Sequence, residues 1–260
     1  MTIHVHRIPA FTDNYLWLLH NDEDGDTAVV DPGDAAPVEQ MLAKLDLTLS
    51  AIVITHHHPD HIGGVDDLLR NRSIPVYGPV SDNIPQVTNR LREGDTVHLA
   101  GAAFQVFEVP GHTLDHIAYY CPRLDRHPAL FCGDTLFAGG CGRLFEGTPE
   151  QMVASLEKLA ALPGDTRIYC AHEYTQANLK FAGAVEPHNG ELARRIGEVA
   201  QMRSENRPTV PSRLEEEMHT NPFMRCSTDA VARAAADHSG RMPACKSETF
   251  AIIRHWKDNF

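Results

Sequence analysis

The sequence lacks several features that would assign the protein to a specialised class. No apolar run approaches the length of a membrane span, and Met1–Arg7 has neither the charged nor the apolar region of a signal peptide. The six cysteines form no CxxC pair, so they indicate free thiols in a reducing compartment. We therefore expect a cytoplasmic protein that does not act at a membrane.

Positive charge is also scarce, and one common catalytic motif is missing. The chain has 23 Lys and Arg residues against 35 Asp and Glu, and its net charge of −12 argues against nucleic acid as a partner. No serine lies in a GxSxG elbow, which disfavours a Ser-His-Asp hydrolase. With 260 residues, 42% of them hydrophobic, the chain can bury the core of one large domain and a smaller appendage.

Histidine, by contrast, is concentrated at one place. Four histidines and an aspartate lie within Thr55–His61, directly after an apolar strand. Side chains alternate along a strand, so His56 and His58 share a face and His57 points the opposite way. The following proline ends the strand, and Asp60 then suits the N-cap of a helix. Buried titratable groups repel or stay unsatisfied without a cation, so the segment predicts a metal site, and one with two ions.

Apolar periodicity and turn residues divide the chain into two parts. Residues 1–173 alternate strands with helices, whereas residues 174–260 contain helical stretches and no convincing strand. The expected strands are 3–9, 14–20, 28–30, 49–54, 74–77, 96–99, 104–109, 117–121, 130–132 and 166–170. The expected helices are 35–46, 61–71, one that begins at a capping box on Thr148, and 174–185, 190–205, 212–219, 229–236 and 247–258. We therefore predict an α/β domain over residues 1–173 and a smaller helical domain over residues 174–260.

Three further candidate ligands stand directly after expected strands, namely His112, Asp134 and His172. Ligands gather outside the strand ends of a sheet, so these residues are expected near the histidine-rich segment. One such residue alone would be a turn or capping residue in most cases, but four strand ends together are harder to dismiss. Asp31, after strand 28–30, fits a partner that orients a ligand histidine and a simple turn residue equally well.

Other residues near the candidate ligands are expected to play structural roles. His116 has helical spacing from His112, but the residues from 117 onward form an expected strand, which disfavours a metal contact. Cys141 and Cys170 are close in sequence to the candidate ligands. We expect them to pack in the core, because metal ions would already supply the nucleophile.

The successive motifs resemble a known family. Thr-His-His-His-Pro-Asp-His, Pro-Gly-His-Thr, Gly-Asp-Thr-Leu-Phe and Cys-Ala-His-Glu-Tyr are similar to motifs of the metallo-β-lactamase superfamily. Residues 140–147, Gly-Cys-Gly-Arg-Leu-Phe-Glu-Gly, then 220–225, Thr-Asn-Pro-Phe-Met-Arg, and the C-terminal Arg-x-x-Lys-Asp-x-Phe resemble the glyoxalase II branch, the hydroxyacylglutathione hydrolases. The resemblance covers essentially the whole chain. It implies an αββα sandwich followed by a smaller helical domain, which refines the α/β class predicted above.

The resemblance also implies the ligand set of two metal ions. The implied ligands are His56, His58 and His112 for the first ion, Asp60, His61 and His172 for the second, and Asp134 as a bridge. These residue types suit Zn²⁺, our default, and also accept iron or manganese. Within this set Asp134, Asp60 and His58 are the predicted catalytic side chains.

The implied substrate is a small-molecule glutathione thioester, bound by a monomer. The resemblance assigns the glutathione moiety to Arg143, Tyr174, Arg254 and Lys257, and three cations suit a peptide with two carboxylates. Spacing alone favours another interpretation, in which Arg254 and Lys257 lie on the solvated face of a last helix. Phe145 stands where some members have tyrosine, and it cannot donate the hydroxyl hydrogen bond.

The implied activity is a binuclear thiolester hydrolase, active in the second step of methylglyoxal detoxification. A metal-bridging hydroxide would hydrolyse S-D-lactoylglutathione, or a related 2-hydroxyacylglutathione, to glutathione and D-lactate. The chemistry of the ligands alone also allows hydrolysis of a lactone, a β-lactam or a phosphodiester. Three other functions remain as alternatives: a single-iron persulfide dioxygenase, a tRNA-processing nuclease, which the net charge disfavours, and a non-catalytic metal or redox module.

Overall fold

The computed structural model describes residues 2–23 and 25–260. The chain forms two compact units. The first unit is Met1–Glu108 with Asp115–Gly133, and the second unit is Val109–Leu114 with Asp134–Phe260. The predicted domain boundary near residue 173 stays a prediction. Among the described residues, no helix combines the length and the apolar character that a membrane crossing requires.

The first unit begins with a sheet whose six strands lie side by side in chain order. Its strands are β1 (Ile3–Ala10), β2 (Asn14–Asn21), β3 (Thr27–Val30), β4 (Ala51–Val53), β5 (Val76–Pro79) and β6 (Asn89–Leu91). The first three strands are antiparallel, and β3 to β6 are parallel. Because β3 and β4 are parallel neighbours, the residues that follow them meet at the same edge of the sheet.

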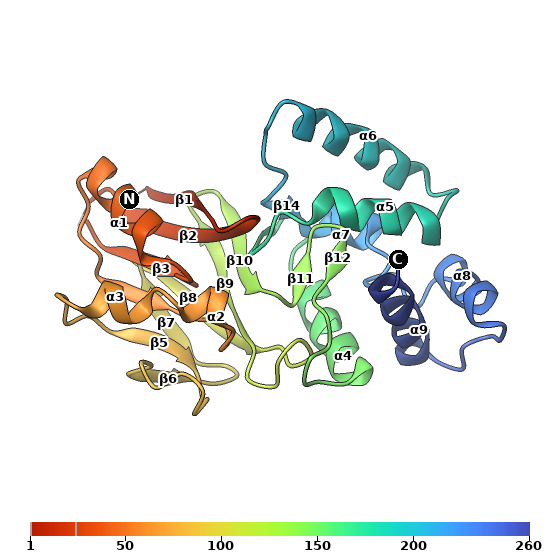
Figure 1. Ribbon diagram of the computed structural model, residues 1–260, viewed down its shortest axis with the longest axis horizontal. Coiled ribbons are helices and arrows are strands. Elements are labelled where there is room, and N and C mark those ends of the chain that lie inside the picture. The colour runs from red at the N-terminus through yellow and green to blue at the C-terminus, as the bar shows by residue number, and fades with distance from the viewer. Residues whose placement is uncertain (1, 24) are drawn as a thin grey trace. The chain divides into compact units, whose positions relative to one another are not determined.

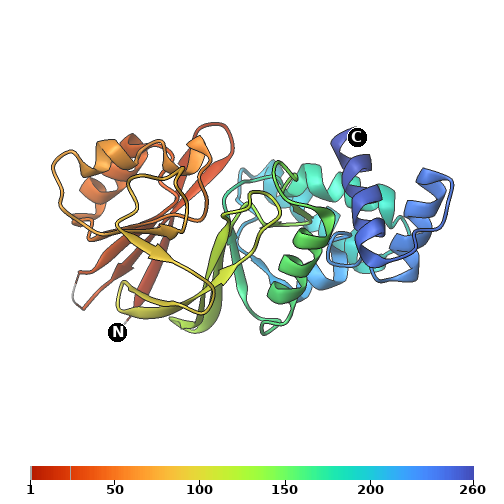
Figure 2. The same ribbon diagram turned by 90° about the horizontal axis from the view of Figure 1, so that it is seen from below.

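Three helices cover one face of this sheet, as the orange ribbons of Figure 2 show. They are α1 (Ala35–Leu45), α2 (Pro59–Ile62) and α3 (Val65–Leu69). Ile8 of β1 and Leu16 and Leu18 of β2 pack in one core with Val38 and Leu42 of α1. Burying an aliphatic side chain of this size stabilises the fold by about 1.5–3 kcal/mol, so this face holds the helices in place.

The first unit also contains four strands of a second sheet. They are β7 (Thr96–Leu99), β8 (Ala102–Glu108), β9 (Ile117–Leu124) and β10 (His127–Gly133), all antiparallel. The β7–β8 hairpin turns at Ala100 and Gly101, both with positive φ, as a two-residue turn of type I′ requires. The Tyr119 hydroxyl of β9 donates a 2.8 Å hydrogen bond to the Ile54 carbonyl. This contact fastens the second sheet to the end of β4.

The second unit is mainly helical. Its strands are β11 (Leu136–Phe137), β12 (Gly140–Cys141), β13 (Arg167–Cys170) and β14 (Ser212–Arg213). Its helices are α4 (Pro149–Ala160), α5 (Thr175–Val185), α6 (Gly190–Ser204), α7 (Leu214–Thr220), α8 (Asp229–Ser239) and α9 (Lys246–Asp258). The predicted capping box on Thr148 is confirmed, and it opens α4. Figure 1 shows α5 beside α6 and α8 beside α9.

Several predicted elements differ from the structure. The single helix expected over 61–71 is two short helices, α2 and α3, separated at Gly63 and Gly64. These glycines lie against backbone, since a Cβ on Gly64 would approach the Ala35 nitrogen to 2.5 Å. The expectation of no strand after residue 174 was also wrong, because β14 pairs with β13. A two-residue strand depends on its distant partner and leaves no periodic pattern of its own.

A buried ion pair holds the β11–β12 hairpin in the second unit. Glu217 of α7 is fully buried and accepts hydrogen bonds from Arg195 of α6 and from the Gly139 backbone nitrogen, the latter at 2.7 Å. Asn221 donates to the same carboxylate and to the carbonyls of Phe137 and Gly140. The hairpin that follows Asp134 is therefore fixed by side chains from α6 and α7.

Replacing Glu217 by alanine should strongly destabilise the protein. The buried Arg195 guanidinium would keep Glu216 and Thr220 but lose its nearest carboxylate, and the Gly139 nitrogen would lose its acceptor, which costs roughly 3–5 kcal/mol. The free energy of unfolding from denaturant titration measures the loss. Glu215→Ala is the matched control, because Glu215 is an exposed carboxylate of the same helix and its removal should cost less than about 0.5 kcal/mol. Equal losses in the two variants would contradict a structural role for the buried pair.

Candidate metal centre

The histidine-rich segment connects β4 to α2 and differs in one detail from the prediction. His58 is the N-cap of α2 and Pro59 is its first residue, so Asp60 lies in the first turn and not at the cap. The helix begins earlier because proline at the first position has the right φ and needs no hydrogen bond. In this first turn Asp60 accepts a 2.9 Å hydrogen bond from the Asn14 side chain, which fixes the direction of its carboxylate.

Asp31 orients two of the histidines, His61 directly and His56 through Thr55. Its buried carboxylate accepts hydrogen bonds from the Thr55 nitrogen at 2.7 Å and the Thr55 hydroxyl at 2.8 Å, and it lies 3.0 Å from His61 Nδ1. The Thr55 hydroxyl is also 3.1 Å from His56 Nδ1. With both Nδ1 atoms directed at this pair, the Nε2 atoms of His56 and His61 point toward the centre. Of the two roles considered for Asp31, the structure supports the orienting partner.

Three candidate ligands belong to the second unit and lie close to one another. Asp134 Oδ2 is 3.4 Å from His112 Nε2, and Asp134 Oδ1 is 3.4 Å from His172 Nε2. Two atoms bound at about 2.1 Å to one tetrahedral ion are about 3.4 Å apart. The distance from Asp134 Oδ2 to His112 therefore fits two ligands of one ion, and the distance from Asp134 Oδ1 to His172 fits two ligands of another. His112 Nδ1 donates to the Arg143 carbonyl at 2.8 Å, which leaves its Nε2 for the ion.

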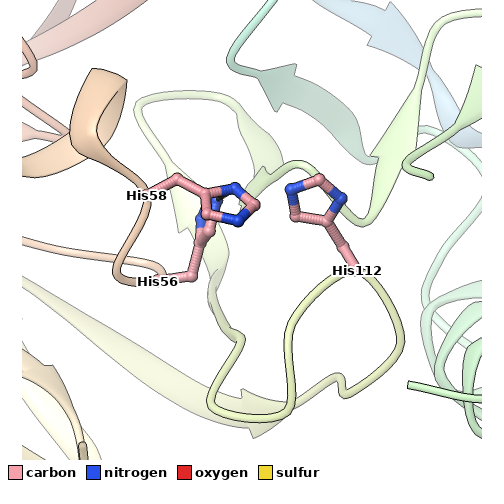
Figure 3. Close-up of side chains that lie close together, drawn as sticks. All are labelled: His56, His58 and His112. Carbon is pink, nitrogen blue, oxygen red and sulfur yellow. Dashed lines mark hydrogen bonds between the residues drawn. The ribbon is translucent and has the colours of Figure 1, made fainter. Parts of the chain in front are cut away.

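The candidate ligands fall into three groups, within each of which one ligand atom per residue lies within 4.8 Å of the others. The groups are His56 with His58 and His112, His56 with His61 and Asp134, and Asp60 with His61 and His172. Figure 3 shows the rings of the first group directed toward one common space. The first and third groups are the two ligand triads that the resemblance implies, and Asp134 falls in a group with one member of each.

The donor chemistry of this arrangement fits two divalent cations. Imidazole nitrogens and carboxylate oxygens are ligands of zinc, iron and manganese. The side chains of His56, His61, His112, Asp134 and His172 are buried, and burial of so many like groups is unfavourable unless cations compensate for the lost water. Seven candidate ligands for two ions are one fewer than two closed four-ligand sites would use, which leaves room for water and substrate, as a catalytic site requires.

Two further histidines, His57 of the segment and His116, were expected outside the metal groups. His57 Nδ1 lies 2.9 Å from the Asp115 carboxylate, and these two form a fourth potential ligand group together with Glu146. His116 belongs to none of the four groups, and its ring stacks on His56 with centroids 4.5 Å apart. Beside it, Gly133 leaves no room for a side chain, since a Cβ would lie 2.4 Å from the Thr55 hydroxyl.

Sequence reasoning missed Thr55, Asn14 and Gly133 as parts of the centre. Asn14 stands about 46 residues before its partner Asp60, a separation at which no local pattern connects two side chains. Thr55 is the first residue of the histidine-rich segment, but its role depends on the parallel pairing of β3 with β4. Only the glycine before Asp134 offered a signal, because glycine often marks a close approach of the backbone.

The four predicted glutathione-binding residues line one cavity of about 420 Å³ in the second unit, and two candidate metal ligands line the same cavity. Its lining includes Arg143, Tyr174, Arg254, Lys257, His112 and Asp134. The Tyr174 ring stacks on the His172 ring with centroids 4.6 Å apart and an angle of 4° between the planes. The cavity therefore brings cationic side chains and candidate metal ligands into one space.

The cations of the cavity differ in how they are held. Arg254 is buried and donates to the Cys141 carbonyl at 3.0 Å and to Asp258 at 3.1 Å. Arg143 is exposed and lies 3.4 Å from the same Asp258 carboxylate. Burial, followed by the charge of Arg254, lowers the pKa of Lys257 to about 8. Lys257 is therefore still largely charged at neutral pH, but it loses its proton more readily than an exposed lysine.

The cysteines near the centre are packed thiols, as expected. Burial raises the pKa of Cys141 to about 11 and the pKa of Cys170 to about 12. Since the thiolate is the nucleophilic form, neither side chain is reactive near neutral pH.

Comparison with known sequences shows similarity along the whole chain. The model described as metallo-beta-lactamase superfamily matches residues 12–172, and the model described as hydroxyacylglutathione hydrolase C-terminus matches residues 173–260. A hydroxyacylglutathione hydrolase of Cupriavidus taiwanensis is 53% identical and covers 98% of this chain and 98% of its own length. One of Pseudomonas aeruginosa is 51% identical, with 99% of this chain and 100% of that protein covered.

Comparison with solved structures shows the fold. The crystal structure of ETHE1 from Myxococcus xanthus matches with a TM-score of 0.68 at 24% identity, over 98% of this chain and 91% of that chain. At this identity the likeness bears on the fold alone. Together with the family models, it confirms the predicted fold class, a metallo-β-lactamase fold of mixed α/β structure followed by a helical region.

We expect Asp31→Asn to weaken metal binding while the protein still folds. The amide can still accept a hydrogen bond from Thr55, but it no longer carries the charge that orients His61, and loss of such a partner typically weakens metal affinity 10–100-fold. Competition with a chelator, followed by elemental analysis, measures the affinity. Asp66→Asn is the control, because Asp66 is an exposed carboxylate on α3 that binds only Gln86 among the contacts seen. Unchanged affinity in Asp31→Asn would rule out the orienting role.

Proposed function

We propose, for a chain that belongs to the hydroxyacylglutathione hydrolase family within the metallo-β-lactamase superfamily, that it hydrolyses S-D-lactoylglutathione to glutathione and D-lactate. This reaction is the second step of methylglyoxal detoxification. The observation that carries the proposal is the cavity of the second unit, where His112 and Asp134 share the lining with Arg143, Arg254 and Lys257.

Two divalent ions are implied by the ligand clusters, and we propose Zn²⁺ for both, with iron or manganese as alternatives. Held by these residues, such ions would lower the pKa of water to about 7 and would polarise a carbonyl. Asp134 is the proposed bridge, since its two oxygens lie equally far from His112 and His172. Asp60 is proposed to hold the second ion, aligned by Asn14, and His58 the first.

Recognition of the substrate is proposed to occur at α9 and at the β12–α4 loop. Arg254 and Lys257 of α9, together with Arg143, place three positive charges around one acidic side chain, Asp258. The excess of positive charge suits the two carboxylates of glutathione, which would compete with Asp258 for the guanidinium groups. Tyr174, stacked on His172, offers a ring face and a hydroxyl beside the centre.

The leaving group needs little help from the protein. A thiol with a pKa of about 8.5 is expelled as a thiolate without strong acid assistance. The cysteines of the cavity region stay protonated, so they do not compete with water for the thioester. The residues of this chain therefore have two tasks, which are to align the thioester and to keep water positioned for attack.

We also propose a cytoplasmic location. All six cysteines are free, and five of them are buried, which suits a reducing compartment. The monomeric state expected from the sequence remains a prediction.

The proposed activity can be tested with metal-loaded protein in anaerobic buffer. Released thiol should appear in step with loss of S-D-lactoylglutathione, because hydrolysis of a thioester consumes water and not oxygen. Metal content is measured on the same sample. Absence of turnover by protein that contains two ions would refute the proposed activity.

The Michaelis constant should rise as the pH is raised from about 7 to about 9, because Lys257 loses its charge near its lowered pKa of about 8 and then no longer attracts a carboxylate. Steady-state kinetics across this range measures the rise. Lys257→Arg is the control, since a guanidinium with a pKa above about 12 keeps its charge and should keep the Michaelis constant level. A wild-type constant that does not change with pH would speak against a role for Lys257 in binding.

A further inference from the structure

A second group of histidines lies in the first unit, away from the candidate ligands in sequence. His4 and His6 of β1 and His20 of β2 point to the face of the sheet that α1 covers, as do Ile8, Leu16 and Leu18 along the same two strands. His4 is directly opposite His20 in the ladder, and His6 is opposite Leu18. On this face, the apolar core residues lie toward one end of the strand pair and the three histidines lie toward the other end.

The three imidazole rings lie at similar distances from one another, and the carboxylate of Asp22 lies beside two of them. The ring centroids are 6.1 Å apart for His4 and His6, 5.6 Å for His4 and His20, and 6.0 Å for His6 and His20. Asp22, just after β2, lies with Oδ2 2.8 Å from His4 Nε2 and with Oδ1 3.8 Å from His20 Nε2. We call these four residues the β1–β2 histidine cluster.

The arrangement is not explained by hydrogen bonding within the protein. Within residues 2–23 and 25–260, the buried atoms His6 Nε2 and His20 Nδ1 have no hydrogen-bond partner, and such atoms are unfavourable in a fold. Burial lowers the pKa of His6, and the neighbouring His20 and His4 lower it further. The ring is therefore held in the neutral form, which has a free lone pair and is the form that binds metal.

The spacing of the rings suits a metal ion. Two imidazoles bound at about 2.1 Å to one tetrahedral ion have ring centroids about 5.2 Å apart. The observed separations of 5.6–6.1 Å are wider, and the ring planes lie at only 25–29° to one another, so the rings would have to rotate to bring one nitrogen of each onto a common ion. His4 and Asp22 are both exposed, and their side chains are free to move. One cation from another element is near, since the charge of Lys44 on α1 acts on His6, but Lys44 is itself exposed.

We propose that His4, His6, His20 and Asp22 bind one additional divalent transition-metal ion, with Zn²⁺ as the preferred metal. Three imidazoles and one carboxylate complete a tetrahedral set, and a site with four protein ligands is closed and serves structure. The ion would join β1, the outermost strand of its sheet, to β2. It would also give the unpartnered nitrogens of His6 and His20 a partner.

Elemental analysis after equilibration with Zn²⁺ and removal of loosely bound metal tests this proposal. His4→Gln and His20→Gln should each contain one equivalent of Zn²⁺ less than the wild type, and thioester hydrolysis should be unchanged. The difference between variant and wild type does not depend on how many ions the catalytic centre holds. His98→Gln is the matched control, because His98 is an exposed strand histidine on β7, and it should retain the wild-type metal content.

Two further measurements make the result independent of the metal count. Zn²⁺ added to the metal-loaded wild type should shift the imidazole nitrogen resonances of His4, His6 and His20 and raise the melting temperature, since a ligand of the native state stabilises it. Both effects should disappear in His4→Gln and His20→Gln. Equal zinc content in these variants and the wild type, or unshifted imidazole resonances in the wild type, would overturn the proposal.

Discussion

The burial of many imidazole and carboxylate groups in one small volume is the constraint on which the structure depends. Such groups lose their hydrogen bonds to water on burial. Cations compensate for this loss on the side of the metal centre, and hydrogen bonds to the opposite ring nitrogen or carboxylate oxygen compensate for it on the other side. The protein supplies these bonds from several places. The Asp31 carboxylate lies against His61 Nδ1 and contacts His56 through the Thr55 hydroxyl. The Asn14 side chain donates to Asp60, and His112 donates to the Arg143 carbonyl.

Close packing of the backbone follows from the same constraint. A Cβ on Gly33 would lie 1.8 Å from the Asp60 carbonyl oxygen, and a Cβ on Gly142 would lie 2.0 Å from the Asp134 carbonyl oxygen. Each of these glycines thus lets another loop approach a candidate ligand on its backbone side. A larger residue at either position would displace the ligand, and displacement of about 1 Å is enough to impair a catalytic arrangement.

The sequence pointed to the candidate ligands, whereas it did not predict most of the residues that support them. The ligands stand in a short histidine-rich motif and at strand ends, where alternation along a strand and resemblance to a known family both apply. The support comes from pairs such as Asn14 with Asp60 and Arg195 with Glu217, which meet only after the chain has folded. The strand β14 was missed for the same physical reason, since it forms only by pairing with the distant β13. The strands β11 and β12 pair with each other, but with two residues each they are too short to show a periodic pattern.

One hydrogen bond links substrate recognition to the proposed chemistry within the second unit. Arg254 of α9 donates to the carbonyl of Cys141, which lies in the β11–β12 hairpin just after Asp134. Glu217 and Asn221 fix the same hairpin from the other side. A glutathione carboxylate bound beside Arg254 would therefore be positioned relative to Asp134 through a short and rigid path. Binding energy gained far from the thioester would then be used to align it, which is how a remote contact can accelerate a reaction.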